Sequence, residues 1–118
     1  MSSHNIQEEL RKAGIQPRGS IAVIADDLVM PLTHSVILKT AGGDAEALTL
    51  ANGTPGQELT ITLVAGAGDC TLTPTTTTGF TAVVLADVKD TVTLEYIDDT
   101  VGWIVIGATG TAANPLIT

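Results

Sequence analysis

Residues 91–107 read TVTLEYIDDTVGWIVIG and carry the pattern of two β-strands joined by a turn. In residues 91–96, apolar and polar side chains alternate, which is the period-2 pattern of a strand with one buried face. Asp98 and Asp99 interrupt the alternation with residues that favour turns. Residues 103–106 then form a continuous apolar run, which predicts a strand covered on both faces. We therefore predict a β-hairpin at the centre of the domain.

The hairpin also contains the strongest candidates for core anchors, because it holds the only Trp and the only Tyr of the chain. Aromatic residues make up only 3% of the sequence, so the rest of the core must consist of aliphatic side chains and Thr methyl groups. Such residues favour pleated sheet. We expect four hairpin residues to anchor the core: Leu94, Tyr96, Trp103 and Val105.

Six further runs show strand patterns at intervals of roughly ten residues, separated by turn signals such as the Asn-Gly and Pro-Gly pairs of residues 52–56. The clearest run is ELTITLV at 58–64, where Leu59, Ile61 and Leu63 share one face. No helical crossover pattern is present, which argues against parallel βαβ units. The sequence predicts an all-β fold, namely a small antiparallel sandwich, jelly roll or barrel of about eight short strands. The last residues, ATGTAANPLIT, lack clear periodicity and are expected to form an extended tail.

Residues 1–20 differ from the rest and are interpreted as an N-terminal arm in front of a β domain at 21–118. Residues 3–14, SHNIQEELRKAG, predict a short helix, because acidic residues come early, basic residues come late, and Gly14 can end it. So short a helix is marginal alone in water and needs a docking surface. The arm is therefore either a docked helix or extended segment, or a frayed and solvated terminus.

The net charge of −8 is unevenly distributed. Residues 1–39 carry four acids and four bases, whereas residues 40–118 carry nine acids and one base. We therefore expect neither nucleic acid nor an anionic membrane as a partner of the β domain. The single cysteine excludes an intrachain disulfide, and no secretory signal or membrane-spanning helix is predicted.

The sequence carries no specific catalytic or cofactor motif, so neither an enzyme nor a cofactor is expected. A hydrolase would need His34 beside a nucleophile such as Cys70, and nothing local supports that pairing. The ordinary interpretation is a structural or solvated His34, a solvated His4 and a buried, inert Cys70. The glycines of GAGD at 66–69 lack the lysine of a phosphate-binding loop and predict a turn.

Two binding hypotheses remain open, each beside a purely structural interpretation of the same residues. The acidic turns could bind Ca²⁺ if strand ends brought their carboxylates together, although turns also use Asp for backbone reasons. The residues concerned are Asp87, Asp90, Asp98 and Asp99. Trp103 and the loop at 75–78 could recognise a glycan, although a lone Trp among Ile and Val is usually part of a core.

Residues 50–107 resemble β modules of bacteriophage virion proteins. The matching pieces are ANGTPGQELTITLVAG, GDCTLTPTTTTGFTAVVL and DVKDTVTLEYIDDTVGWIVIG, and their order carries the resemblance. Such pieces recur in head decoration (cement) proteins, head fibres and some tail-fibre modules. This resemblance covers about half of the chain and offers no catalytic motif to transfer.

The resemblance implies a homotrimer, made in the host cytoplasm, that binds the major capsid protein on the outer surface of an icosahedral head and stabilises it. A fibre or tail module that binds a host-surface glycan is the alternative. The first 40 residues match nothing in the family, so a capsid-binding role of the arm is a hypothesis. The arm residues assigned to it are Ile6, Leu10, Arg11, Ile15, Pro17 and Arg18.

Overall fold

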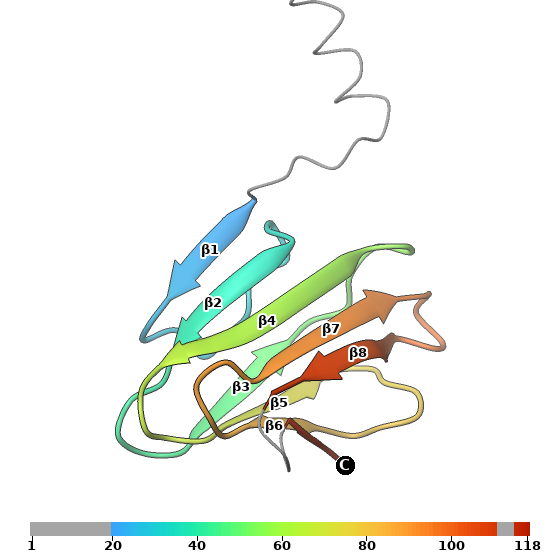
Figure 1. Ribbon diagram of the computed structural model, residues 1–118. Coiled ribbons are helices and arrows are strands. Elements are labelled where there is room, and N and C mark those ends of the chain that lie inside the picture. Colours follow the sequence, from blue (N-terminus) through green and yellow to red (C-terminus); the bar gives the residue numbers. More distant parts are fainter. Residues whose placement is uncertain (1–19, 111–114) are drawn as a thin grey trace, which may run out of the picture.

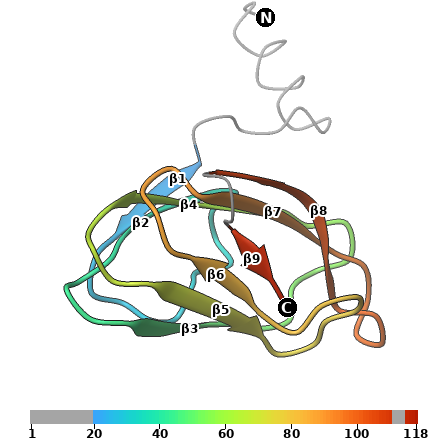
Figure 2. The same ribbon diagram turned by 60° about the horizontal axis from the view of Figure 1, so that its bottom comes forward.

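Nine β-strands form two sheets that pack face to face in the computed structural model, which describes residues 20–110 and 115–118 (Figures 1 and 2). The five-stranded sheet has the order β1-β2-β4-β7-β8, with β1 at Ile21–Ile24, β2 at Val36–Thr40, β4 at Glu58–Ala65, β7 at Thr91–Tyr96 and β8 at Trp103–Thr109. The four-stranded sheet has the order β3-β5-β6-β9, with β3 at Glu46–Leu50, β5 at Cys70–Pro74, β6 at Val83–Leu85 and β9 at Leu116–Ile117. The described residues contain no helix, and the predicted all-β class is confirmed.

The sheets are mixed rather than purely antiparallel. The pairs β1–β2, β2–β4 and β3–β5 are parallel, whereas β4–β7, β5–β6, β6–β9 and β7–β8 are antiparallel. The parallel pairs arise because the first half of the chain alternates between the two sheets. Even the connection from β1 to β2 follows this course, since Val29 forms a parallel bridge with Thr49 of β3. A strand of the opposite sheet thus makes the crossover that parallel neighbours need, a role usually filled by a helix.

Close backbone contacts fix the turns of this winding. Gly66 has φ +106°, and a Cβ at its position would lie 2.1 Å from the carbonyl oxygen of Ala41, so only glycine fits there. The amide of Gly68 donates to the carbonyl of Gly42 at 2.8 Å. The GAGD segment is therefore a turn, and it packs against the segment that follows β2.

Alternating side chains from both sheets fill the space between the layers. On β4, Leu59, Ile61 and Leu63 are fully buried, as their spacing predicts. Cys70 and Leu72 enter the same core from β5. The buried apolar set is Ile24, Met30, Ile37, Ala41, Leu48, Leu50, Leu59, Ile61, Leu63, Cys70, Leu72, Phe80, Val83, Leu85, Val92, Leu94, Tyr96 and Trp103.

The predicted hairpin is present as β7 and β8, but it lies at one edge of the five-stranded sheet rather than at its centre. Leu94, Tyr96 and Trp103 are fully buried, whereas Val105 is partly buried and packs against the core. The expectation that residues 103–106 are covered on both faces is wrong for the single chain, because Ile106 lies on the outer face and is 46% exposed.

The C-terminal residues form more strand than the sequence indicates. β8 continues to Thr109, and residues 116–117 pair with β6 as the edge of the four-stranded sheet. Within residues 20–110 and 115–118, no helix has the length and apolar character needed to span a bilayer. The proposed arm residues Ile6, Leu10, Arg11, Ile15, Pro17 and Arg18 lie outside the described residues.

Candidate functional site

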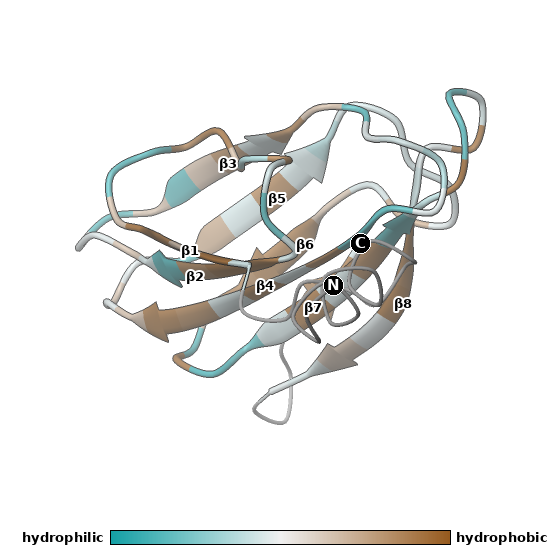
Figure 3. Ribbon diagram, turned by 90° about the horizontal axis from the view of Figure 1, so that it is seen from above, coloured by the Kyte–Doolittle hydropathy of each residue, from teal (hydrophilic) through white to brown (hydrophobic). Residues whose placement is uncertain are grey.

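The outer face of the five-stranded sheet carries exposed apolar side chains on its two edge strands. On β1, Ala22 and Ile24 turn toward the core, so Ile21 and Val23 point outward and are 46% and 75% exposed. The register places Ile21 beside Val36 and Val23 beside Leu38 of β2. These four side chains form one patch, called the aliphatic block below: Ile21, Val23, Val36 and Leu38. Figure 3 shows β1 in the brown of hydrophobic residues along its whole length.

Threonines occupy the middle of this outer face. The hydroxyl oxygens of Thr60 and Thr93 lie 3.0 Å apart, and those of Thr62 and Thr91 lie 3.1 Å apart, across the β4–β7 pair. Each pair uses one of its two hydroxyl protons for the hydrogen bond between the threonines, and Thr91 donates its own proton to the carbonyl of Lys89 at 3.0 Å. Covering the centre of the outer face with another apolar surface therefore costs few hydrogen bonds to water, chiefly that of the second proton in the Thr60–Thr93 pair.

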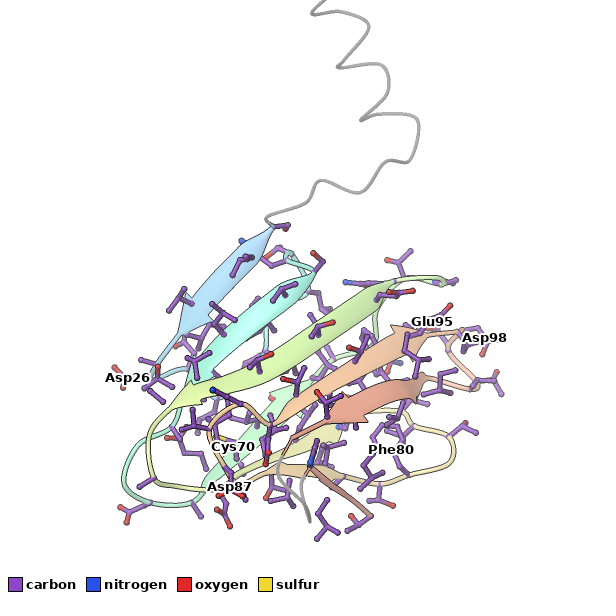
Figure 4. The ribbon with its side chains drawn as sticks, viewed as in Figure 1. Asp26, Cys70, Phe80, Asp87, Glu95 and Asp98 are labelled. Atoms are coloured by element: carbon purple, nitrogen blue, oxygen red, sulfur yellow. The ribbon has the colours of Figure 1, made fainter. Side chains whose placement is uncertain are left out.

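A second apolar strip follows at the other side of the outer face. Ile104 lies beside Glu95 in the β7–β8 register, and Ile106 follows on the same strand, next to a bulge. We call Ile104 and Ile106 the β8 strip. Charge on the outer face is confined to one end, where Glu58 and Glu95 are direct neighbours in register. Figure 4 shows Glu95 at the same end of the molecule as the turn at Asp98.

The inner face holds a buried lysine that was not predicted from the sequence. Lys39 is fully buried, and its Nζ donates to the carbonyls of Ala25 at 2.7 Å and Asp27 at 3.2 Å. It also lies 2.8 Å from Oε1 of Glu46. The hydrogen bond from Lys39, followed by that from the Gly42 amide, lowers the pKa of Glu46 below its usual range. Alternation with buried Ile37 is the signal in the sequence that could have revealed this inward position.

This ion pair links β2 to β3 and to the segment after β1, so its role is structural. The three described contacts of the Lys39 ammonium group are with two backbone carbonyls and the Glu46 carboxylate, all on neighbouring segments. Cys70 is the register neighbour of Glu46 and is fully buried. Burial, and then the charge of Glu46, raise the pKa of the Cys70 thiol, so it stays protonated at neutral pH.

The structure does not bring His34 and Cys70 together. His34 precedes β2, and its Nδ1 lies 2.9 Å from the hydroxyl of Thr33. Cys70 begins β5 beside Glu46, which pairs with Lys39 near the other end of β2. The two residues needed for a His–Cys hydrolase are thus at opposite ends of the sandwich.

The acidic turns also lie apart. Asp90 precedes β7 and Asp98 follows it, and Figure 4 shows Asp87 and Asp98 at opposite ends of the molecule. Asp90 Oδ2 accepts from the amides of Ala86 and Asp87 at 3.0 Å, and Asp98 Oδ1 accepts from Thr100 at 2.9 Å. Within the described ranges, no group of three or more His, Cys, Asp and Glu side chains could hold a metal ion. The four-carboxylate calcium site is therefore wrong, and backbone contacts explain these aspartates.

Trp103 offers no surface to a sugar ring, because it is fully buried. Its Nε1 donates to the carbonyl of Ala51 at 3.0 Å, and its ring meets Tyr96 edge to face at 5.2 Å between centroids. The threonine loop is bound to the same strand, since the Trp103 amide donates to the carbonyl of Thr76 at 2.8 Å. Gly102, with φ +73°, makes this approach possible, because a Cβ there would lie 2.2 Å from the same carbonyl.

A hollow of about 450 Å³ lies beside the loop at 52–57 and Leu32. The loop is held by Gln57, whose side chain donates to the carbonyl of Leu32 at 2.9 Å and accepts from Thr54 at 3.0 Å. No charged side chain lines the hollow. Its polar side chains are Asn52, Thr54 and Gln57, and Gln57 is engaged in holding the loop, so the hollow is a weaker candidate than the outer face.

Comparison with known proteins finds no matching family model and no matching curated protein.

Proposed function

We propose that this chain is a structural virion protein, a decoration (cement) protein that binds the outer surface of a phage head as a homotrimer and stabilises it. The observation that carries the proposal is the order of turn and strand pieces over residues 50–107, which resembles head decoration modules. In the fold, these pieces supply β4, β5, β6, β7 and β8, so the resemblance follows a connected half of the sandwich rather than scattered loops.

Surface chemistry supports a role in assembly. Residues 40–118 carry nine acids against one base, which favours solubility when many copies are crowded on one particle. The outer face of the five-stranded sheet supplies a neutral surface for protein contacts. A decoration protein gains its hold from many modest contacts made at once, and such contacts need shape and apolar area rather than catalytic groups. The partners are then the major capsid protein and further copies of the chain, and the location is the outside of the virion.

The test is co-sedimentation of the purified chain with undecorated heads of the phage that carries the gene. We expect saturable binding, and decorated heads should retain DNA at higher temperature than bare heads. A chain lacking residues 1–20 should keep its β-sheet circular dichroism spectrum and lose head binding. Failure of the intact chain to bind heads would contradict the function, whereas full binding by the truncated chain would contradict only the role of the arm.

A further inference from the structure

We infer that the outer face of the five-stranded sheet is covered by a second copy of this chain, with the aliphatic block of one copy against the β8 strip of the next. The inference deepens the self-association in the proposed function, and the ring described below rests on it. Four observations carry it: the exposure of the two apolar sets, the paired threonines, the uncharged strand edges and the distribution of charge.

The β1 edge of the five-stranded sheet lacks the features that usually prevent edge-to-edge association, and the β8 edge is covered at Trp103 alone, by the bridge from Thr77. Edge strands are commonly shielded by charged residues, Pro or a covering segment. The β1 sequence IAVI has none of these, and no described residue pairs with its free side. The β8 sequence WIVIGAT carries no charge either, although its first residue, Trp103, pairs with Thr77 of the threonine loop. In the four-stranded sheet, by contrast, the β3 edge is partly covered by the bridge from Val29, and the β9 edge is two residues long.

Charge selects another copy as the occupant. A second copy brings the same excess of carboxylates, so most approaches of two copies place acids against acids. The outer face avoids this, because its block, its threonines and its β8 strip are uncharged, and its two glutamates lie together at one end. A basic partner would instead be drawn to the acidic loops.

The outer face is small for a stable contact between two copies. Five strands about 4.8 Å apart and about five residues long give a footprint of roughly 400 Å². This is about half of what each partner buries in a typical stable pair. In a head-to-tail contact, one copy contributes its aliphatic block and the next copy its β8 strip. Each copy can therefore make two such contacts, and in a closed ring every copy makes both.

The test is the mass of the full-length chain in solution, measured by sedimentation equilibrium over a range of concentrations. We expect about 36 kDa for a ring of three 12.1 kDa chains, with dissociation on dilution. Val23→Asp and Ile106→Asp should each raise the dissociation constant at least about tenfold, because each buries an unpaired charge in the contact. Val29→Asp is the matched control: Val29 is 66% exposed but lies beside the four-stranded sheet, so this change should leave the mass unaltered.

A charge exchange tests which surfaces meet. In the Val23→Asp/Ile106→Lys double variant, each contact would join one Asp to one Lys, so association should recover relative to either single change. All variants should keep the wild-type circular dichroism spectrum, because the altered side chains are exposed.

Several results would overturn the inference: a wild-type chain that is monomeric throughout, equal weakening by Val29→Asp, or no recovery in the double variant. Self-association that appears only after removal of residues 1–19 would show that the chain's own N-terminal segment covers the face. None of these measurements involves heads, so a failed surface assignment and a failed decoration role are distinguishable.

Discussion

The two faces of the five-stranded sheet use the same strands for different purposes. On β4, Ile61 is fully buried between the layers, whereas its neighbour Thr62 points outward and hydrogen-bonds to Thr91. On β8, Trp103 is enclosed and Ile106 is 46% exposed. The inner face therefore holds the stability of the single chain, and the outer face is free to serve association. This contrast teaches that substituting an inward-facing apolar residue should lower the free energy of unfolding far more than substituting its outward-facing neighbour on the same strand.

The largest effect is expected at the aromatic end of the inner face. Trp103→Ala should lower the free energy of unfolding by about 3–5 kcal/mol, the usual cost of deleting a large buried side chain. It removes the hydrogen bond to Ala51 and the edge-to-face contact with Tyr96. Urea unfolding followed by circular dichroism measures the change, because the only Trp is lost as a probe.

Ile104→Ala, one residue further along β8, is the matched control on the outer face. It should cost about 1 kcal/mol or less in a dilute sample, since the side chain is only partly buried in one copy. Equal losses for the two variants would erase the proposed difference between the faces.

Breaking the buried ion pair is expected to cost somewhat less. Lys39→Met should destabilise the fold by about 2–3 kcal/mol, because it leaves two carbonyls without their donor and removes the cation that pairs with Glu46, which keeps the Gly42 amide. We place this below the usual range for buried pairs because 17% of the Glu46 side chain is exposed to water. Adding Glu46→Gln to Lys39→Met should recover part of the loss in the same urea assay.

Acid should remove the contribution of this pair. The pKa of Glu46 is lower in the folded chain than its ordinary value of 4.5, so the stabilisation is fully present above pH 4.5 and is lost as the pH falls through the folded pKa. The stability difference between wild type and Glu46→Gln should shrink over that interval. A difference that stays constant down to pH 2 would contradict the assigned pairing.

The single Tyr offers a spectroscopic test of the enclosed aromatic end. Burial, and then the hydrogen bond that its hydroxyl donates to Asp99, raise the pKa of Tyr96 to about 12. Because the unfolded value is near 10, folding stability should fall as the pH rises between about 10 and 12. Ultraviolet titration of tyrosinate measures the pKa directly.

Asp99→Asn should lower the Tyr96 pKa only part of the way, because burial remains the larger cause. A wild-type Tyr96 that titrates at its ordinary pKa in the folded chain would mean that the turn at residues 97–102 opens to solvent.

The smallest effect is expected at the centre of the outer face. A double-mutant cycle with Thr60→Val and Thr93→Val should give a coupling of about 0.2–1 kcal/mol, typical of cross-strand pairs. Both single variants should remain folded, because the face is not part of the core. A coupling of several kcal/mol would show that the outer face contributes to stability as strongly as the inner one.

Sequence patterns predicted which residues face the core better than they predicted which strands pair. The alternation in ELTITLV placed Leu59, Ile61 and Leu63 inward, and their burial follows from period 2 alone. Alternation says nothing about a strand's neighbour, so the parallel pairs β1–β2, β2–β4 and β3–β5 were not foreseen. The apolar run of β8 had the same limitation, because an apolar run alone does not show whether both faces of a strand are covered by the same chain.

The candidate site was harder to anticipate. Lys39 was counted as a charge, although its alternation with Ile37 implied an inward position. The outer face depends on the lateral order of strands, because Ile21 and Leu38 belong to one patch only when β1 and β2 are neighbours.

Strand β9 could not be predicted either, because it spans two residues and is too short for any periodic signal.

The winding of the first half of the chain between the two layers has a consequence for how the protein folds. Neither layer can be assembled by zipping adjacent hairpins, because β2 meets β4, and β3 meets β5, only after the intervening strand has crossed to the other side. Such contacts join residues distant in sequence, and high contact order is associated with folding in milliseconds to seconds. A fragment that ends before β5 would lack the strands that pair with β3 and with one side of β4, so we expect the sandwich to form in a single cooperative step.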